Sequence, residues 1–320
     1  MKQLKGRNIL VTGGAGFLGS NLTHSLLGKG AKVICFDDLS TGKIKNIKEF
    51  LGQGNFKFIK GNANNYRELQ KAFLKNKIDY VFHYAARVGV LRTVERPLEV
   101  LEDILGIRNI LDLALKNKIK KALFSSSSEV YGEPLNLPER EDGHLGAKFP
   151  YATVKLLGEH YFQAYWKTFG MPTSAVRIFN VYGPKQESSS YGFVVGIFIR
   201  QALGGKPLSV FGDGKQTRDF VYVEDNINAV IRALLSDRTN GESVNIGAGR
   251  PVTIKELAQK IIRISGSKKS KIKFVPLRKG GEIRHRFPDM TKMKKLIGFR
   301  PEHSLEEGLK KTFLWYKSNL

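Results

Sequence analysis

The chain alternates short apolar runs with longer amphipathic stretches over its first 180 residues. The runs have the length of buried strands, whereas the stretches between them repeat apolar positions with the period of a helix. This pattern predicts strands at 7–12, 32–36, 56–60, 79–83, 121–126 and 173–178, and helices near 17–28, 66–76, 97–116 and 150–168. Such alternation favours an α/β fold with a doubly wound parallel sheet, which binds ligands beyond the carboxyl ends of its strands.

Beyond residue 180 the pattern changes, because glycine-rich loops separate the apolar runs. Helical periodicity recurs near 192–203, 223–236, 253–265 and 304–318. We therefore expect a first domain over residues 1–180 and a smaller α/β lobe over residues 181–320 that completes a cleft. The chain can cross back between the two.

The composition is that of a globular protein, with 41% hydrophobic residues in a chain of 320. No apolar run approaches the roughly 20 residues of a membrane span, and no signal-peptide core precedes the first strand, so we expect a cytoplasmic protein without a membrane partner. The single cysteine, Cys35, is expected as a small buried hydrophobe, which leaves no disulfide framework and no thiolate metal site. The net charge of +24 raises nucleic acid as a partner, but the basic residues are scattered without a nucleic-acid motif, so we expect none.

A glycine-rich segment connects the first expected strand to the first expected helix. Gly13 can turn the chain tightly, Gly16 allows the backbone to approach a pyrophosphate, and Gly19 allows the helix to pack closely on its strand. The helix N-terminus adds free N–H groups and a positive dipole. The second strand ends at Asp37 and Asp38, where a carboxylate suits the ribose hydroxyls of NAD and repels the extra phosphate of NADP. This order of elements predicts an NAD-binding Rossmann domain.

Polar side chains follow the fifth expected strand and open the next helix. Four serines occupy residues 125–128, at a strand end where packing alone does not explain them. Tyr151 and Lys155 are four residues apart and share one face of the expected helix, so the ammonium can lie near the phenol and favour the phenolate. A tyrosine whose pKa is lowered from about 10 toward neutrality can act as a general base on a sugar hydroxyl.

Together these segments resemble the extended short-chain dehydrogenases/reductases and, within them, the nucleotide-sugar epimerase/dehydratase family. The resemblance runs nearly from end to end. Besides the glycine loop and the Tyr151/Lys155 pair, it rests on the strings at residues 83–86, 177–184, 212–225 and 281–285.

The resemblance implies roles for the catalytic residues. Tyr151 would remove the proton of the sugar 4-hydroxyl as hydride passes to NAD, Lys155 would also hold the nicotinamide ribose, and Ser127 would hydrogen-bond the same sugar oxygen. Further cofactor contacts are implied at Phe17, Leu18, Asn62, Ala85 and Ala86.

The resemblance also implies a substrate site and an assembly. The residues that would grip the diphosphate are Asn180, Arg218 and Arg284. Guanidinium groups suit phosphate oxygens, and Phe211 would lie against the nucleobase. A homodimer is implied as well, with the helices near residues 97–116 and 150–168 pairing across a two-fold axis.

Members of this family share the oxidation of C4 to a ketone and differ in the fate of that ketone. An epimerase returns hydride to the other face, a decarboxylase loses the C6 carboxylate of a uronic acid, and a 4,6-dehydratase removes water across C5 and C6. Thr153 and the string at residues 218–225 resemble epimerases. We therefore expect a UDP-hexose 4-epimerase of the UDP-glucose/UDP-galactose type, with a UDP-sugar as substrate.

Glu129 keeps the decarboxylase alternative open, because an acid at this position resembles the decarboxylase and dehydratase branches, where it acts on C5 or positions water. Ser128 stands where dehydratases carry an aspartate acid, so that branch lacks its proton donor. A uronate would need cations near C6, since an unpaired buried carboxylate is costly. The candidate cations are Arg87, Arg92 and Lys185. Glu187 in the following loop opposes them.

Two positions depart from the family pattern. Asn62 replaces an aspartate that meets the adenine, and Asp103 stands where an asparagine is common. The added negative charge of Asp103 is expected to compete for the Lys155 ammonium and to raise the pKa of Tyr151.

An alternative of another class is a dinucleotide-binding module that binds RNA or another polyanion through its positive charge. The set formed by Ser127, Tyr151 and Lys155 argues against it, because a scaffold needs no base with an ammonium and a polar partner.

Overall fold

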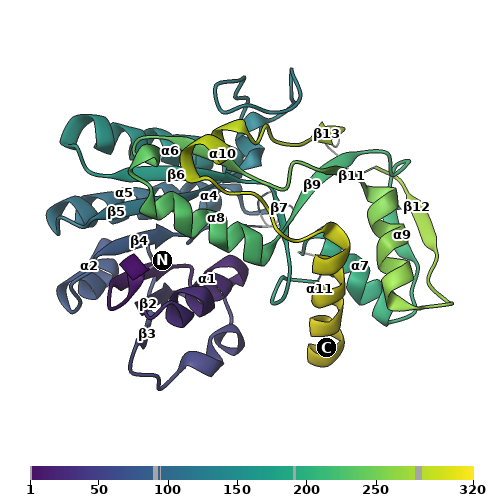
Figure 1. Ribbon diagram of the computed structural model, residues 1–320, viewed down its shortest axis with the longest axis horizontal. Coiled ribbons are helices and arrows are strands. Elements are labelled where there is room, and N and C mark those ends of the chain that lie inside the picture. The colour runs from purple at the N-terminus through teal and green to yellow at the C-terminus, as the bar shows by residue number, and fades with distance from the viewer. Residues whose placement is uncertain (1, 89–92, 94, 190–191, 278–282) are drawn as a thin grey trace.

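The computed structural model describes residues 2–88, 93, 95–189, 192–277 and 283–320, and its centre is a seven-stranded parallel sheet with helices on both faces (Figure 1). The strand order is β10-β6-β5-β4-β1-β2-β3. The strands are β1 (Asn8–Thr12), β2 (Lys32–Asp37), β3 (Phe56–Lys60), β4 (Tyr80–His83), β5 (Lys121–Ser127), β6 (Thr173–Ile178) and β10 (Ser243–Ile246). The predicted α/β class with a doubly wound parallel sheet is confirmed, and the six expected strands agree within one residue at each end.

The alternation of side chains along each strand explains the two helical layers. In β1, Ile9 and Val11 belong to one hydrophobic cluster, whereas Leu10 belongs to the other. The helices of the first face are α1 (Phe17–Gly28), α8 (Val223–Leu235) and α10 (Thr291–Ile297), and those of the second are α2 (Tyr66–Leu74), α5 (Asp103–Lys116) and α6 (Pro150–Phe169). The short helix α4 (Pro97–Leu101) packs against α6.

Cys35 points from β2 toward the first face, where it is a free and buried thiol. A Cβ added at Gly14 would lie 2.5 Å from its sulfur, so the thiol packs directly beneath the glycine-rich loop. Burial raises the pKa of this thiol above its usual range. The expectation of a buried hydrophobe is confirmed.

The second lobe gathers at one end of the molecule (Figure 1). Its helices are α7 (Val194–Leu203), α9 (Ile254–Ser265) and α11 (Leu305–Asn319). Its strands are β7 (Asn180–Tyr182), β8 (Leu208–Phe211), β9 (Thr217–Tyr222), β11 (Pro251–Thr253), β12 (Ile272–Val275) and β13 (His285–Arg286). β11, β9 and β13 form one small sheet with β7 paired to β9, and β8 pairs with β12.

The chain crosses back to the first lobe after residue 180. β10 pairs with β6 as an edge strand of the large sheet, and α8 packs against α1. Local signals still define the elements, since α9 begins at a capping box of Thr253 and Glu256 and ends at Gly266 with a φ of +64°. Short 3-10 helices complete the described chain: η1 (Lys2–Leu4), η2 (Ile44–Asn46), η3 (Lys48–Phe50), η4 (Ser128–Tyr131) and η5 (Asp237–Thr239). None of the described helices is long and apolar enough to cross a bilayer.

Candidate active site

The loop between β1 and α1 makes close contacts that only glycine permits. Gly13 has a φ of +68°, and a Cβ there would lie 2.8 Å from the backbone that follows β4. A Cβ at Gly19 would lie 2.1 Å from the carbonyl oxygen of Gly13. Gly16 is the N-cap of α1, where a Cβ would come no closer than 3.2 Å to a neighbouring atom and no side chain caps the helix. The first N–H groups of α1, including those of Phe17 and Leu18, therefore point out of the helix toward any bound pyrophosphate.

The two acids after β2 differ in their surroundings. Asp37 is almost fully buried and accepts hydrogen bonds from the backbone N–H groups of Ala15 (2.9 Å) and Leu39 (2.8 Å). Burial raises the pKa of the Asp37 carboxyl. Asp38 is less buried and accepts from the backbone N–H and the hydroxyl of Ser40, at 2.8 and 2.6 Å. Asp37 thus ties the glycine loop to the strand end, and both acids stand at the edge where a ribose is expected.

Asn62, Ala85 and Ala86 follow β3 and β4 at the same edge of the sheet. The Asn62 N–H donates to the carboxylate of Glu68 at 2.8 Å, which fixes the turn into α2. The Ala85 N–H donates to the side chain at the end of β1 at 3.3 Å. The glycine loop, the uncapped helix and these strand ends together fit a dinucleotide laid across the carboxyl edge of the sheet.

β5 and α6 bring the three expected catalytic side chains together. Ser127 is the last residue of β5, and α6, which packs against β5, carries Tyr151 and Lys155 in its first turns. The Ser127 side chain lies close enough to the Tyr151 phenol to lower its pKa. Nζ of Lys155 lies 5.5 Å from the centroid of the Tyr151 ring and donates to the backbone oxygen of Ser125 at 2.6 Å. A phenol, an ammonium and a hydroxyl thus converge where the dinucleotide edge meets the second lobe.

The electrostatics of Tyr151 differ from the expectation. Desolvation raises the pKa of the phenol above its usual range, the interaction with Ser127 lowers it by less, and Glu129 and Asp103 raise it further. The prediction that Lys155 draws this pKa toward neutrality is wrong for this state, because its ammonium is directed to a backbone carbonyl and desolvation is the larger effect. The phenol is therefore held protonated.

Asp103 has a partner of its own. Its carboxylate accepts hydrogen bonds from the backbone N–H of Arg87 (2.7 Å) and from Nη1 of the same arginine (3.0 Å). Nε of Arg87 also pairs with Glu99 at 3.5 Å. Burial lowers the pKa of Lys155 to about 8, and Asp103 and Glu159 raise it against that effect. Asp103 therefore raises the pKa of Tyr151 as expected, but it sustains the charge of Lys155 without drawing the ammonium out of the site.

The cations expected near a C6 carboxylate are engaged elsewhere. Arg87 is held by its two acids, and Lys185 pairs with Glu49 at 2.9 Å. Glu187 pairs with a different lysine at 3.0 Å, so it does not oppose Lys185. Arg92 lies outside the described residues. Both described candidates are thus paired with acids in this structure.

An arginine that the sequence analysis missed lies beside Glu129. Arg286 in β13 is buried and forms an ion pair with Glu129. Its Nη2 also donates to the carbonyl of Gly132 at 3.3 Å. The side chain of Glu129 is 40% exposed, and its backbone N–H donates to Ser127 at 3.2 Å, which places the pair next to this candidate serine. The only signal in the sequence was the position of Arg286 directly after the string at residues 281–285.

The residues expected to grip a diphosphate come from neighbouring segments. Asn180 in β7 donates to the backbone of β9 at 3.3 Å, and Arg218 belongs to β9, so these two are on paired strands. Arg284, just before β13, binds both carboxylate oxygens of Asp213 at 2.9 and 2.8 Å, and about half of its side chain is exposed. Phe211 is half-buried at the end of β8, in the separate two-stranded sheet. The fork of Arg284 is thus occupied by a carboxylate that a phosphate would have to displace.

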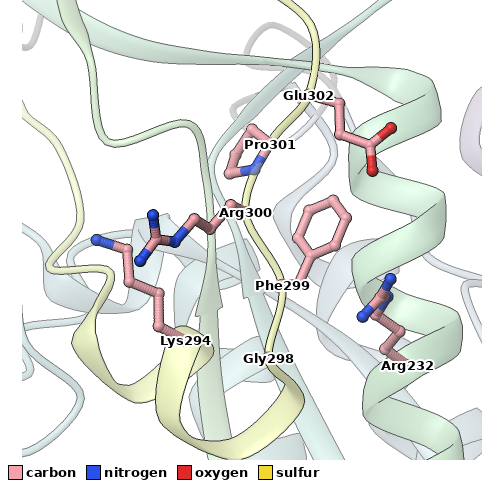
Figure 2. A pocket seen from close by; sticks show the side chains of 7 residues that line it. All are labelled: Arg232, Lys294, Gly298, Phe299, Arg300, Pro301 and Glu302. Atoms are coloured by element: carbon pink, nitrogen blue, oxygen red, sulfur yellow. The ribbon is translucent and has the colours of Figure 1, made fainter.

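A separate pocket of about 510 Å³ opens between α8, α10 and the segment that leads to α11 (Figure 2). Its described lining consists of Arg232, Lys294, Gly298, Phe299, Arg300, Pro301 and Glu302. Lys294 and Arg300 extend on one side of the segment, whereas Phe299 points toward Arg232, whose guanidinium lies 5.5 Å from the ring centroid (Figure 2). None of these lining residues belongs to the expected cofactor, catalytic or substrate sets, so the pocket is not part of the candidate active site.

Comparison with known proteins agrees with this geometry. The model of the NAD dependent epimerase/dehydratase family matches residues 9–247. A UDP-N-acetyl-alpha-D-glucosaminuronate decarboxylase of Bacillus cytotoxicus is 41% identical, over 97% of this chain and 98% of the relative. A UDP-glucose 4-epimerase of Mycolicibacterium smegmatis is 33% identical, over 97% of this chain and 98% of the relative. The solved UDP-glucose 4-epimerase of Thermotoga maritima with UDP-glucose superposes with a TM-score of 0.92 at 35% identity, covering 98% of this chain and 99% of that one.

Proposed function

The chain belongs to the NAD-dependent epimerase/dehydratase family, and from this premise we propose that it decarboxylates a UDP-linked uronic acid after oxidation at C4. The observation that carries the proposal is the buried Arg286, paired with the partly open Glu129 next to Ser127. A guanidinium in this position can exchange its carboxylate partner for the carboxylate of a substrate, whereas a neutral hexose offers it no counter-charge. The relative from Bacillus cytotoxicus, a uronate decarboxylase by name, supports the same choice.

The described residues at the sheet edge fit NAD. The loop of Gly13, Gly16 and Gly19 would hold the pyrophosphate, Asp37 would bind a ribose, and Lys155 would hold the nicotinamide ribose. Bound there, NAD supplies the oxidation of C4 to a ketone and the later reduction of that ketone.

The chain's own residues act on the sugar oxygen at C4. The phenol of Tyr151, protonated in this structure, would first lose its proton, with the ammonium of Lys155 stabilising the phenolate. The phenolate would then receive the proton of the 4-hydroxyl, and Ser127 would hydrogen-bond the same sugar oxygen. Lys155 is buried and Tyr151 is partly buried, which strengthens these interactions relative to water.

A ketone at C4 places the C6 carboxylate β to a carbonyl, so the bond between C5 and C6 can break with release of CO2. The electron pair of that bond moves onto C5 and the C4 oxygen, where Ser127 and the protonated phenol of Tyr151 can donate hydrogen bonds. Arg286 would hold the carboxylate until the bond breaks. Glu129 would orient the water that gives a proton to C5. The raised pKa of Tyr151 thus suits the second half of the reaction, in which the residue is a donor.

A UDP-hexose 4-epimerase, the reaction favoured by the sequence, is the second candidate. It is supported by the likeness to the Thermotoga maritima epimerase over nearly the whole chain. Both reactions use Ser127, Tyr151 and Lys155 in the same way, so this set does not distinguish between them.

Proton NMR of the purified protein with NAD and, separately, UDP-glucuronate, UDP-N-acetylglucosaminuronate, UDP-glucose and UDP-N-acetylglucosamine tests the proposal. We expect a UDP-pentose from a uronate, and loss of that product in Arg286→Ala. The matched control is Arg300→Ala, an exposed arginine of the separate pocket. Formation of galacto-configured hexose without any pentose would overturn the decarboxylase and establish the epimerase.

A further inference from the structure

A second carboxyl group, that of Glu139, belongs to a segment that pairs with the residues after Arg286, and it has no role in the proposed reaction. The backbone N–H of Glu139 donates to the carbonyl of Phe287 at 2.9 Å, and its carbonyl accepts from the N–H of Asp289 at 2.8 Å. Glu139 therefore lies alongside the residues that directly follow β13. Its side chain is 3% exposed, and neither carboxyl oxygen has a hydrogen-bond partner among the described residues. An acid buried in this way is costly unless it has a partner in some state of the protein.

The charged groups that face Glu139 are mostly arginines. Burial raises the pKa of Glu139 to about 8, Arg286 opposes this most strongly, Glu129 adds to it, and Arg218 and Arg177 oppose it in turn. Nε of Arg286 is itself buried without a hydrogen-bond partner among the described residues. Arg286 and Arg218 are partners in the register of β13 and β9, so two of the arginines that lower the pKa of Glu139 adjoin each other.

Arg286 thus has one open carboxylate partner and a second, buried carboxyl group on which its charge acts. Glu129 holds one Nη group and is partly exposed, whereas Glu139 is buried, forms no ion pair with Arg286 in this state, and faces an arginine whose Nε has no hydrogen-bond partner among the described residues. If a substrate carboxylate replaces Glu129, the guanidinium loses its only charged hydrogen-bond partner in the described chain. A second anchor at Nε would keep it in place.

We propose that Glu139 is a positioning residue, whose carboxyl group anchors the Nε edge of Arg286 when Glu129 yields its ion pair to the carboxylate of the substrate. The inference rests on the proposed function, because only a uronate brings that carboxylate. A neutral carboxyl group can accept the Nε–H without opposing the substrate, whereas an ionised one competes with the substrate for the same charge. Affinity for a uronate should therefore weaken as the pH rises through the range in which Glu139 ionises.

The test measures dissociation constants by calorimetry with NAD present, for UDP-glucuronate and for UDP as a ligand without a carboxylate. A Tyr151→Phe background prevents turnover, so binding is measured whether or not the protein decarboxylates this sugar. Between about pH 6.5 and 9.5 we expect the affinity for UDP-glucuronate to fall about tenfold more than that for UDP. Glu139→Gln, which keeps an acceptor but cannot ionise, should bind UDP-glucuronate well without that additional pH dependence.

Two further variants separate positioning from folding. Glu139→Leu removes the acceptor and should bind UDP-glucuronate about tenfold more weakly at every pH, with unchanged affinity for UDP. Glu133→Gln, an exposed acid of the same loop, is the matched control and should retain the full pH dependence. The proposal is overturned if Glu139→Gln keeps that dependence, if Glu139→Leu loses both ligands equally, or if UDP-glucuronate behaves like UDP throughout. A protein that passes this test but forms no pentose from either uronate would refute the proposed function alone.

Discussion

Alanine substitutions in the glycine loop should separate the folding of the first lobe from its binding of NAD. At Gly19 a methyl group would lie 2.1 Å from the carbonyl oxygen of Gly13 and 2.7 Å from Cα of Gly14. Both are backbone atoms that cannot rotate away, so α1 must shift. We expect a strain of about 3 kcal/mol, at the upper end for overpacking, of which the better helix propensity of alanine offsets about 1 kcal/mol. Gly19→Ala should therefore lower the free energy of unfolding by about 2 kcal/mol.

Gly16→Ala should act on the cofactor instead. Gly16 has a φ of −75°, which alanine adopts without strain, and its Cβ would come no closer than 3.2 Å to a neighbouring atom. At an N-cap the substitution costs about 0.5 kcal/mol. The methyl group would stand where the pyrophosphate approaches, so we expect a loss of affinity for NAD of about 100-fold. At an NAD concentration of 100 times the original dissociation constant, the stabilisation by NAD should fall from about 2.7 to about 0.4 kcal/mol.

Denaturant unfolding with and without NAD measures both effects on the same samples. Gly28→Ala is the control, because a Cβ at that end of α1 meets no atom within 4 Å, and it should keep both the stability and the response to NAD. The reasoning would be refuted if Gly16→Ala were destabilised as much as Gly19→Ala, or if it kept the full stabilisation by NAD.

Three further variants test other parts of the molecule. Tyr151→Phe should lower kcat about 1,000-fold in the NMR assay with little change in affinity for UDP, and retention of full activity would exclude the phenol as base. Burial lowers the pKa of Lys121 to about 7 from the ordinary 10.5. Between these two pH values Lys121 therefore binds a proton more fully in the unfolded chain than in the folded protein. The unfolding free energy should therefore rise with pH across that window in the unmodified protein, and a Lys121→Met variant with the same slope would contradict this. Leu98 and Leu105 are 76% and 50% exposed on α4 and α5, and changing both to Glu should convert the predicted homodimer to a monomer by light scattering, whereas a monomeric unmodified protein would refute the dimer.

The cofactor half of the site could be predicted because its parts are close together in the sequence. Gly13 and Gly19 act within one turn of the chain, and Asp37 reaches the loop from the next strand. Ser127 and Tyr151 meet because one helix follows one strand and packs on it. Each of these contacts follows from the order of local elements, which hydrophobic periodicity reports well.

The substrate half depends on contacts that no local pattern reports. Arg286 meets Glu129 across 157 positions, through a two-residue strand that has no periodicity to recognise. Glu139 likewise pairs with the residues that directly follow this short strand, far away in the sequence. β10 was missed as a seventh sheet strand for a related reason, since four residues carry too little pattern to distinguish a strand from a loop. Even within α6, the spacing of four residues correctly placed Lys155 near Tyr151 but could not show that a backbone carbonyl would take its ammonium.

The charges around Lys155 explain why an acid at position 103 is compatible with the site. Burial lowers the pKa of this lysine to about 8, although Asp103 and Glu159 both act against that loss. Each acid has an arginine of its own, since Arg87 binds Asp103 at 3.0 Å and Arg177 binds Glu159 at 2.8 Å. The two pairs are close to neutral in sum, so the net positive charge of this cluster belongs to Lys155. An asparagine at position 103 would leave Arg87 half-paired and remove one of the two groups that keep the ammonium charged. Asp103 and Arg87 therefore act as one ion pair, which preserves the positive charge of Lys155 beside Tyr151.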